Sequence, residues 1–175
     1  MERVTIFIDG SNFYHALKRC FGTASIDFEK LAASLVGSRK LIRIYYYNAP
    51  VNQAEEPDKF KDQQRFFDKL RSVPYLDLKL GRLEKRRGTV VEKGVDVNIA
   101  VDMLRLAYKD TYDTAILISG DGDFAAAVEA VKDLGKHVEN AFPRKGLSRH
   151  LWNACDRFVE LDQDLIDQCR VTPIS

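Results

Sequence analysis

Two short apolar runs, each ended by an acidic, glycine-containing turn, constrain most strongly how this 175-residue chain can fold. They span residues 4–8 and 114–118 and are rich in β-branched residues, as strands buried on both faces usually are. A segment with the three- and four-residue apolar spacing of a helix follows each run. Buried strands that alternate with helices predict an α/β fold, in which a mostly parallel central sheet is flanked by helices on both faces.

The remaining segments continue this alternation of strands and helices. Short linkers join them, so we expect one domain over residues 1–162 and a polar C-terminal tail with a weak helix over residues 163–175. Ser11 or Asn12 is the expected N-cap of the first helix, and Asp27 that of the second. Helices are expected over residues 11–21, 25–37, 55–73, 93–108, 121–135 and 148–155, and further strands over residues 40–50, 75–86, 136–143 and 157–161.

Composition and charge exclude several classes of protein. The formal net charge is only +1, so any surface for nucleic acid must be local. No apolar stretch approaches the roughly 20 residues that a membrane span needs, and no signal peptide opens the sequence. Three widely spaced cysteines support neither a disulfide framework nor a zinc site. We therefore expect a cytoplasmic protein with no membrane partner.

Carboxylates gather at the predicted ends of the strands. In an open parallel sheet, ligands bind beyond the carboxyl ends of the strands. Asp9 follows the first apolar run, Asp121 and Asp123 follow the second, and Asp96 opens the helix before the second run. A turn or a helix cap would explain each of these residues taken alone. Together they predict four carboxylates from three segments that meet at one edge of the sheet.

Such a group of like charges requires a cation or a shift in pKa. No Arg or Lys adjoins Asp9, Asp121 or Asp123 in the sequence. A hard divalent ion such as Mg²⁺ or Mn²⁺ is the natural partner, and it can activate water and stabilise charge on a transferring phosphoryl group. Polar residues that suit contact with a phosphate, although capping also explains them, are Ser11, Asn12 and Ser119.

A local cluster of basic residues precedes Asp96. Residues 79–94 hold six Lys or Arg against two Glu, a net charge of +4. Alternation around Arg86 and Arg87 suggests a protruding hairpin tip that contacts phosphates, and an ordinary solvated turn is the alternative. Further candidate phosphate contacts are Lys93, Arg144 and Lys145.

Aromatic residues give a weaker indication of nucleic-acid binding. A tyrosine of the run Tyr45–Tyr47, at the end of a predicted strand, could stack on a base of a single-stranded substrate, although packing in the core explains at least two of the three. Ser148 and Trp152 are assigned to the cap and the core of a short helix.

Three sequence blocks carry a resemblance to a known family. FIDGSNFY, KGVDVNIAVDML and ISGDGDFAAAVEAVKDLGKHV resemble the signature blocks of the NYN family, and more narrowly of its LabA-like (DUF88) branch in the PIN-like nuclease superfamily. The resemblance runs from about Val4 to about Leu161. It implies a PIN-like three-layer fold and Mg²⁺- or Mn²⁺-dependent cleavage of RNA. The catalytic, metal-binding aspartates of the family fall on Asp9, Asp96, Asp121 and Asp123, and its asparagine on Asn12.

The leading hypothesis is therefore a metal-dependent ribonuclease, a hydrolase that acts on single-stranded RNA. The alternative is a non-catalytic RNA-binding or regulatory module that keeps the acidic pocket. A phosphatase is disfavoured because the segment DGSN lacks the second aspartate of a DxD loop. Because PIN-like folds often pair, the resemblance also allows a homodimer.

Overall fold

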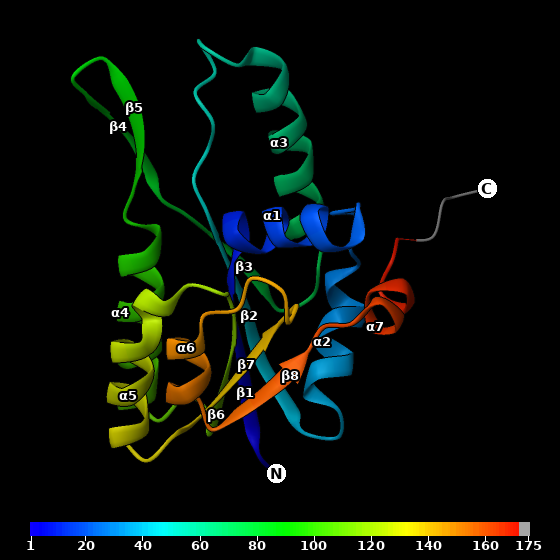
Figure 1. Ribbon diagram of the computed structural model, residues 1–175, viewed down its shortest axis with the longest axis vertical. Coiled ribbons are helices and arrows are strands. Elements are labelled where there is room, and N and C mark those ends of the chain that lie inside the picture. Colours follow the sequence, from blue (N-terminus) through cyan, green and yellow to red (C-terminus); the bar gives the residue numbers. More distant parts are fainter. Residues whose placement is uncertain (172–175) are drawn as a thin grey trace.

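The computed structural model describes residues 1–171, with the side chains of residues 90–92 left aside, and it confirms the α/β fold. Six strands form one sheet in which all neighbouring pairs are parallel (Figure 1). From one edge of the sheet to the other, the strands are β3 (Leu76–Leu80), β2 (Lys40–Asn48), β1 (Arg3–Asp9), β6 (Thr114–Ile118), β7 (His137–Phe142) and β8 (Arg157–Glu160).

Successive strands are added on one side of β1 first and on its other side afterwards. The chain runs outward from β1 through β2 to β3, and it then crosses to β6 on the other side of β1. Ile8 of β1 pairs with Ile118 of β6, so the residues that follow these two positions, Asp9 and Ser119, lie side by side at the carboxyl ends of the strands. Such a switch point is where open parallel sheets bind ligands.

Helices cover both faces of the sheet. One face packs against α1 (Gly10–Phe21), α2 (Phe28–Val36), α3 (Pro57–Arg71) and α7 (Gln163–Gln168). The other face packs against α4 (Val95–Tyr108), α5 (Ala125–Asp133) and α6 (Arg149–Ala154). No helix within the described residues is long and apolar enough to cross a membrane.

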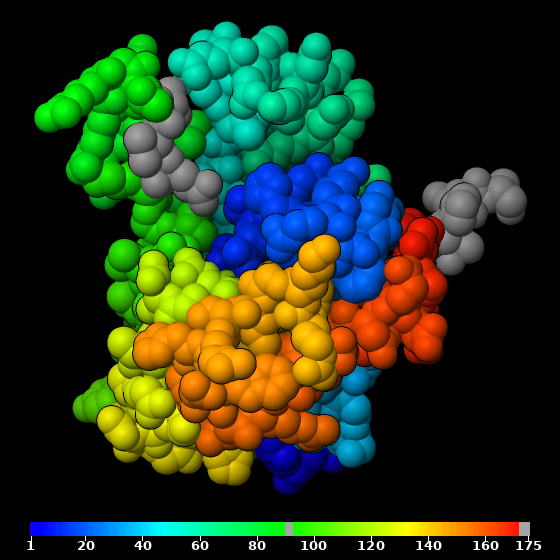
Figure 2. Space-filling view, in the orientation of Figure 1, coloured from blue at the N-terminus to red at the C-terminus, as the bar shows by residue number. Residues whose placement is uncertain are grey.

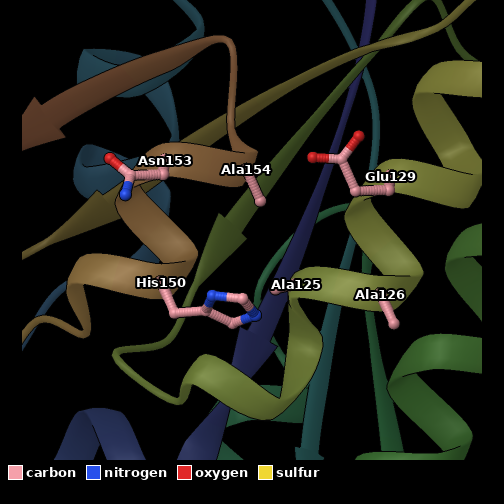
Figure 3. Close-up of a pocket in the computed structure, with 6 residues that line it drawn as sticks. All are labelled: Ala125, Ala126, Glu129, His150, Asn153 and Ala154. Carbon is pink, nitrogen blue, oxygen red and sulfur yellow. The ribbon is translucent and has the colours of Figure 1, made fainter.

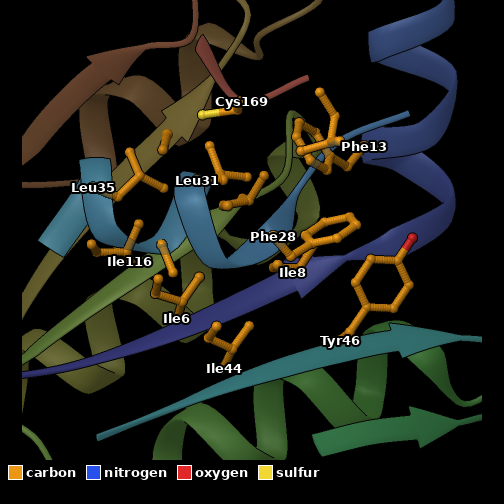
Figure 4. Close-up of a cluster of buried hydrophobic side chains, with 14 of the residues drawn as sticks. Ile6, Ile8, Phe13, Phe28, Leu31, Leu35, Ile44, Tyr46, Ile116 and Cys169 are labelled. Carbon is orange, nitrogen blue, oxygen red and sulfur yellow. The ribbon is translucent and has the colours of Figure 1, made fainter. Parts of the chain in front are cut away.

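Alternating side chains of the central strands build the two cores. Ile6 and Ile8 of β1 enter the first core, where Phe13 of α1 and Phe28 of α2 lie over them (Figure 4). Phe7 points to the opposite face and enters the second core. This period of two is the ordinary geometry of a strand, and it buries β1 on both sides.

The segment after residue 162 packs onto the first core. Ile166 of α7 and Cys169 are both fully buried, and Arg170 forms an isolated antiparallel bridge with Ile26. The described part of the predicted tail therefore buries apolar side chains in the core of the domain. The domain boundary at residue 162 stays a prediction.

The single strand expected over residues 75–86 is wrong, because the chain divides at Gly81. β3 joins the parallel sheet, whereas β4 (Arg82–Arg86) pairs with β5 (Thr89–Lys93) in a separate antiparallel hairpin. A Cβ atom on Gly81 would lie 2.8 Å from Val95 Cγ2 and 2.9 Å from the Lys93 carbonyl oxygen. The close approach of these two segments therefore requires glycine where the strand ends.

Two of the expected caps are present, and a third is corrected. Asp27 accepts hydrogen bonds from the amides of Glu29 and Lys30, and Ser148 accepts one from Leu151. Neither Ser11 nor Asn12 caps the first helix, because α1 begins earlier, at Gly10, with Asp9 in the cap position. The helix begins directly at the end of β1 and leaves no connecting loop.

Two predictions for aromatic residues are also corrected. Trp152 is 40% exposed and packs against Phe158 with a centroid distance of 4.5 Å, so it lies outside the core. Tyr45, Tyr46 and Tyr47 are all buried in the two cores, so none of them is available to stack on a base.

The tight junction between β1 and α1 gives a prediction for stability. A Cβ atom on Gly10 would lie 2.5 Å from the carbonyl oxygen of Tyr47, and that backbone atom belongs to a central strand and cannot move aside. We expect Gly10→Ala to lower the free energy of unfolding by about 1–3 kcal/mol in urea denaturation. The matched control is Ser11→Ala, which we expect to change it by less than about 0.5 kcal/mol. Equal effects of the two substitutions would contradict the close contact.

Candidate functional site

Asp9 is the most buried carboxylate at the carboxyl edge of the sheet. It ends β1, and only 4% of the residue is exposed. Its Oδ2 atom accepts a hydrogen bond of 3.0 Å from the hydroxyl of Ser119, which directly follows β6. Ser119 is itself fully buried. This arrangement favours a role for Ser119 in orienting Asp9 over the direct substrate contact that the sequence suggested.

A short network of hydrogen bonds joins the start of α1 to the turn after β6. Asn12 Oδ1 accepts a hydrogen bond of 2.9 Å from the amide of Gly120. The Ser119 hydroxyl also accepts one of 3.1 Å from the amide of Asp121. Asn12 therefore positions the turn that carries two of the carboxylates.

Asn140 of β7 supports the same turn and was not singled out from the sequence. Its side-chain amide donates to the carbonyl oxygens of Leu117 and Ser119, at 3.0 and 2.9 Å. The residue is fully buried, and its Oδ1 atom has no hydrogen-bond partner in the described structure. The sequence carried little indication of this role, because His137 and Glu139 are also polar residues of the same strand.

The turn itself fixes the backbone around Asp121. Asp121 caps the 3₁₀ turn η1 (Gly122–Phe124), and its Oδ1 atom accepts a hydrogen bond of 2.9 Å from the amide of Asp123 within that turn. A Cβ atom on Gly120 would lie 2.5 Å from the ring of Phe142 and 2.8 Å from the Gly146 carbonyl oxygen. A glycine is therefore needed for the turn to fit against the neighbouring loop.

The carboxylates influence one another electrostatically. Burial, helped by the charges of Asp96 and Asp121, raises the pKa of Asp9 to about 7 against the opposing hydrogen bond from Ser119. Burial also raises the pKa of Asp96, and the charges of Asp121 and Asp123 add to the effect. The fold thus brings carboxylates of β1, α4 and the β6 turn into range of one another.

The oxygen ligands of these residues are of the kind that a hard divalent cation takes, but the described structure does not gather three or more of them as metal ligands in the way that the sequence predicted. Within residues 1–171, none of the four carboxylates forms an ion pair with Lys, Arg or His, and every side-chain donor that they offer is oxygen. No group of three or more His, Cys, Asp or Glu side chains among the described residues is arranged to hold a metal ion. The individual carboxylates remain suitable ligands for Mg²⁺ or Mn²⁺, because these ions can bind one or two carboxylates and keep several waters.

Asp102 lies on α4, beyond this group. It accepts a hydrogen bond of 2.8 Å from the hydroxyl of Tyr47 and pairs with Arg105 at 3.0 Å. These contacts tie α4 to β2, so Asp102 has a structural role.

The predicted hairpin is present and projects from the body of the molecule (Figure 2). Arg87 and Gly88 form its two-residue turn, with φ of 49° and 79°. Glu84 partly neutralises two basic residues of the hairpin, because its Oε2 atom lies 3.2 Å from Lys93 Nζ and 3.9 Å from Arg86 Nε. In Figure 1 the hairpin extends from the same end of the molecule as the carboxyl ends of the strands.

The second predicted basic site lies in the loop after β7. Arg144 pairs with Glu160 at 3.1 Å and lies over the ring of Trp152, 5.7 Å from its centroid. The side chain of Arg144 is therefore held by β8 and α6. Lys145 is exposed, and its carbonyl oxygen accepts the thiol hydrogen of Cys20, which joins the loop to α1.

A small cavity of about 250 Å³ between α5 and α6 lies apart from the predicted residues. Its lining includes three alanines, and the imidazole of His150 points into it from α6 (Figure 3). None of the predicted site residues lines this cavity.

The fold and the acidic switch point define a PIN-like α/β domain. The chain belongs to the NYN domain family, whose model matches residues 3–162. This match confirms the resemblance seen in the sequence blocks, and it indicates a nuclease-like, RNA-related function.

Individual relatives agree with this assignment. The low amplitude and bright protein LabA of Synechococcus elongatus is 27% identical over 169 residues, which cover 92% of this chain and 84% of LabA. The uncharacterized protein MJ0482 of Methanocaldococcus jannaschii is 28% identical over 55% of this chain and 48% of its own length. A crystal structure of a Vibrio parahaemolyticus protein of unknown function, VPA0982, has the same fold, with a TM-score of 0.78 and 24% identity over 97% of this chain and 96% of that one.

The raised pKa of Asp9 predicts a pH-dependent effect on stability. Between about pH 4 and 7 the unfolded chain releases this proton while the folded protein retains it, so the wild type loses stability as the pH rises through this window. Asp9→Asn keeps an acceptor for Ser119 but cannot ionise. We expect the variant to match the wild type at pH 4 and to exceed it by on the order of 2–4 kcal/mol at pH 8, measured by urea denaturation in EDTA.

The control for this experiment is the addition of a divalent ion. Mg²⁺ or Mn²⁺ at pH 8 should stabilise the wild type and leave the unfolding midpoint of Asp9→Asn nearly unchanged. A constant difference between the two proteins from pH 4 to 8 would contradict the raised pKa.

Proposed function

We propose that this protein is a metal-dependent ribonuclease that hydrolyses phosphodiester bonds of single-stranded RNA at the carboxyl edge of its sheet. One observation carries the proposal. Carboxylates of three segments influence one another electrostatically at the switch point without a cationic partner among the described residues, and two of them have raised pKa values. Membership of the NYN family supports RNA as the substrate.

Each carboxylate has a distinct structural support. Asp9 is held by Ser119, Asp121 and Asp123 by the 3₁₀ turn, and Asp96 by the first turn of α4. These four side chains would hold Mg²⁺ or Mn²⁺, which supplies positive charge against the charge that develops on the reacting phosphate. Because the supports come from rigid elements, the carboxylates keep their relative positions when a substrate binds.

The positive charge for substrate binding lies mainly on the hairpin. Residues 79–94 carry a net charge of +4 in a chain of net charge +1, and the hairpin leads directly into α4 and Asp96. Contacts of Arg86, Arg87 and Lys93 with phosphates would hold RNA without reading its sequence. Ser11 and Lys145 are further candidate contacts, since Ser11 in the first turn of α1 is partly exposed and Lys145 in the loop after β7 is exposed.

A non-catalytic RNA-binding module is the second candidate. It is favoured by the lack of a preassembled group of three metal-binding side chains in the described residues. Such a module would bind RNA through the hairpin without turnover in either metal. The homodimer remains a prediction in both cases.

The nuclease is tested by Asp121→Asn. Asparagine keeps the oxygen that accepts the Asp123 amide, so the turn and the free energy of unfolding should be preserved. Removing one charge from the ion site should slow cleavage of a labelled single-stranded RNA about 100-fold or more in Mg²⁺ or Mn²⁺. The matched control is Asp133→Asn, an exposed carboxylate at the end of α5, which should cleave at the wild-type rate. Full activity of Asp121→Asn would remove this residue from the site.

The hairpin is tested by the salt dependence of RNA binding. Replacing Arg86 and Arg87 by Ala should weaken binding at low salt and reduce the slope of log K against log salt by about 1 for each lost phosphate contact. Fluorescence anisotropy in EDTA measures this slope on intact RNA. The same slope for the wild type and the double variant would show that the hairpin tip does not touch the phosphates.

A further inference from the structure

A groove of about 730 Å³ lies between α1 and α3, on the far side of α1 from the β6 turn. Ser11 lines this groove, whereas its neighbour Asn12 faces the β6 turn through Gly120. Ser11 lies only two residues after Asp9, so the groove opens beside the acidic edge. Its volume is that of a pocket for a small molecule or for one unit of a polymer. In Figure 2, α3 lies directly above α1 on the viewed face.

The wall formed by α1 carries an exposed aromatic corner. Tyr14 is 44% exposed, and the ring of His15 stands nearly perpendicular to it, at 81° and 5.4 Å between centroids. Lys18, one turn further along α1, places its Nζ atom 6.0 Å from the Tyr14 centroid. Neither ring is part of either core. An exposed aromatic ring next to a cation is a typical surface on which nucleobases stack.

The opposite wall and the floor are fixed in place. Gln63 of α3 accepts a hydrogen bond from the amide of Val51 at 2.8 Å and donates one to the carbonyl oxygen of Ala49 at 3.1 Å. These bonds tie α3 to the segment that follows β2. Tyr46 and Asn48 of β2 form the floor. The groove is therefore preformed.

The charges along the groove compensate one another. Lys59 pairs with Glu56 at 2.5 Å, and Asp62 lies 3.6 Å from Arg65. The charged residues that line the groove are two lysines, Lys18 and Lys59, and two carboxylates, Glu56 and Asp62, so their formal charges cancel. A groove without net positive charge holds a phosphate poorly. It suits an uncharged group with an aromatic face and several hydrogen-bonding atoms, which describes the base and ribose of a nucleotide.

We infer that this groove binds the nucleoside of single-stranded RNA next to the phosphate held at the acidic edge, with its base stacked on Tyr14. The inference rests on the proposed function and adds the position of the substrate. The phosphodiester backbone then passes over the start of α1, between the groove and the carboxylates.

The test compares three variants in binding to a fluorescein-labelled ten-nucleotide RNA, measured by anisotropy in EDTA so that the RNA stays intact. Tyr14→Ala should bind about 10-fold more weakly or worse, because a stacked base is lost. Tyr14→Phe keeps the ring and should bind within about twofold of the wild type. Tyr108→Ala removes a tyrosine that is 81% exposed at the far end of α4 and should also bind like the wild type.

Cleavage of the same RNA in Mg²⁺ and Mn²⁺ separates this inference from the proposed function. If the wild type cleaves but Tyr14→Ala binds as tightly as the wild type, the nuclease stands and the groove is refuted as the nucleoside site. If the wild type does not cleave but its binding depends on Tyr14, the groove stands and the nuclease fails. If the wild type binds no RNA, both are overturned.

Discussion

The repulsion between carboxylates at the carboxyl edge of the sheet is the constraint on which the site depends. The opposite edge shows the usual solution, because the guanidinium of Arg3 pairs with Asp113 at 2.7 Å and holds the pKa of that carboxyl well below its usual range. At the carboxyl edge, burial and neighbouring charges push the pKa of Asp9 upward instead. The same residue type is thus stabilised as an anion at one end of the strands and destabilised at the other. Carboxyl groups with strongly shifted pKa values are common at functional sites.

The fold makes this arrangement rigid. β1 is buried on both faces, and α1 follows it without a loop, so the position of Asp9 is fixed by two cores. Side chains of Asn12 and Asn140 then fix the neighbouring turn from opposite sides. The carboxylates cannot easily move apart to relieve their repulsion, because movement of Asp9 would disturb the most central strand of the sheet.

The sequence was sufficient for what depends on local patterns. Apolar periodicity predicted the helices and the parallel sheet, whereas a single site made of the four carboxylates stays a prediction. It failed where distant contacts decide the outcome. Gly81 ends a strand because Val95 and Lys93 pack against it, and α1 begins earlier than expected, at Gly10, with Asp9 in the cap position in place of Ser11 or Asn12. The bracing role of Asn140 depends on which strand lies beside β6, and one sequence does not contain that order.

The hairpin of β4 and β5 forms a sheet of its own and shares no backbone pairing with the six-stranded sheet. The exposed residues at its tip, Arg86 and Arg87, belong to neither core. Replacement of these residues therefore carries little folding cost, whereas any larger side chain at Gly10 disturbs the centre of the domain. The tip of the hairpin can therefore vary among related chains without loss of the fold, whereas the residues packed around β1 are constrained by both cores.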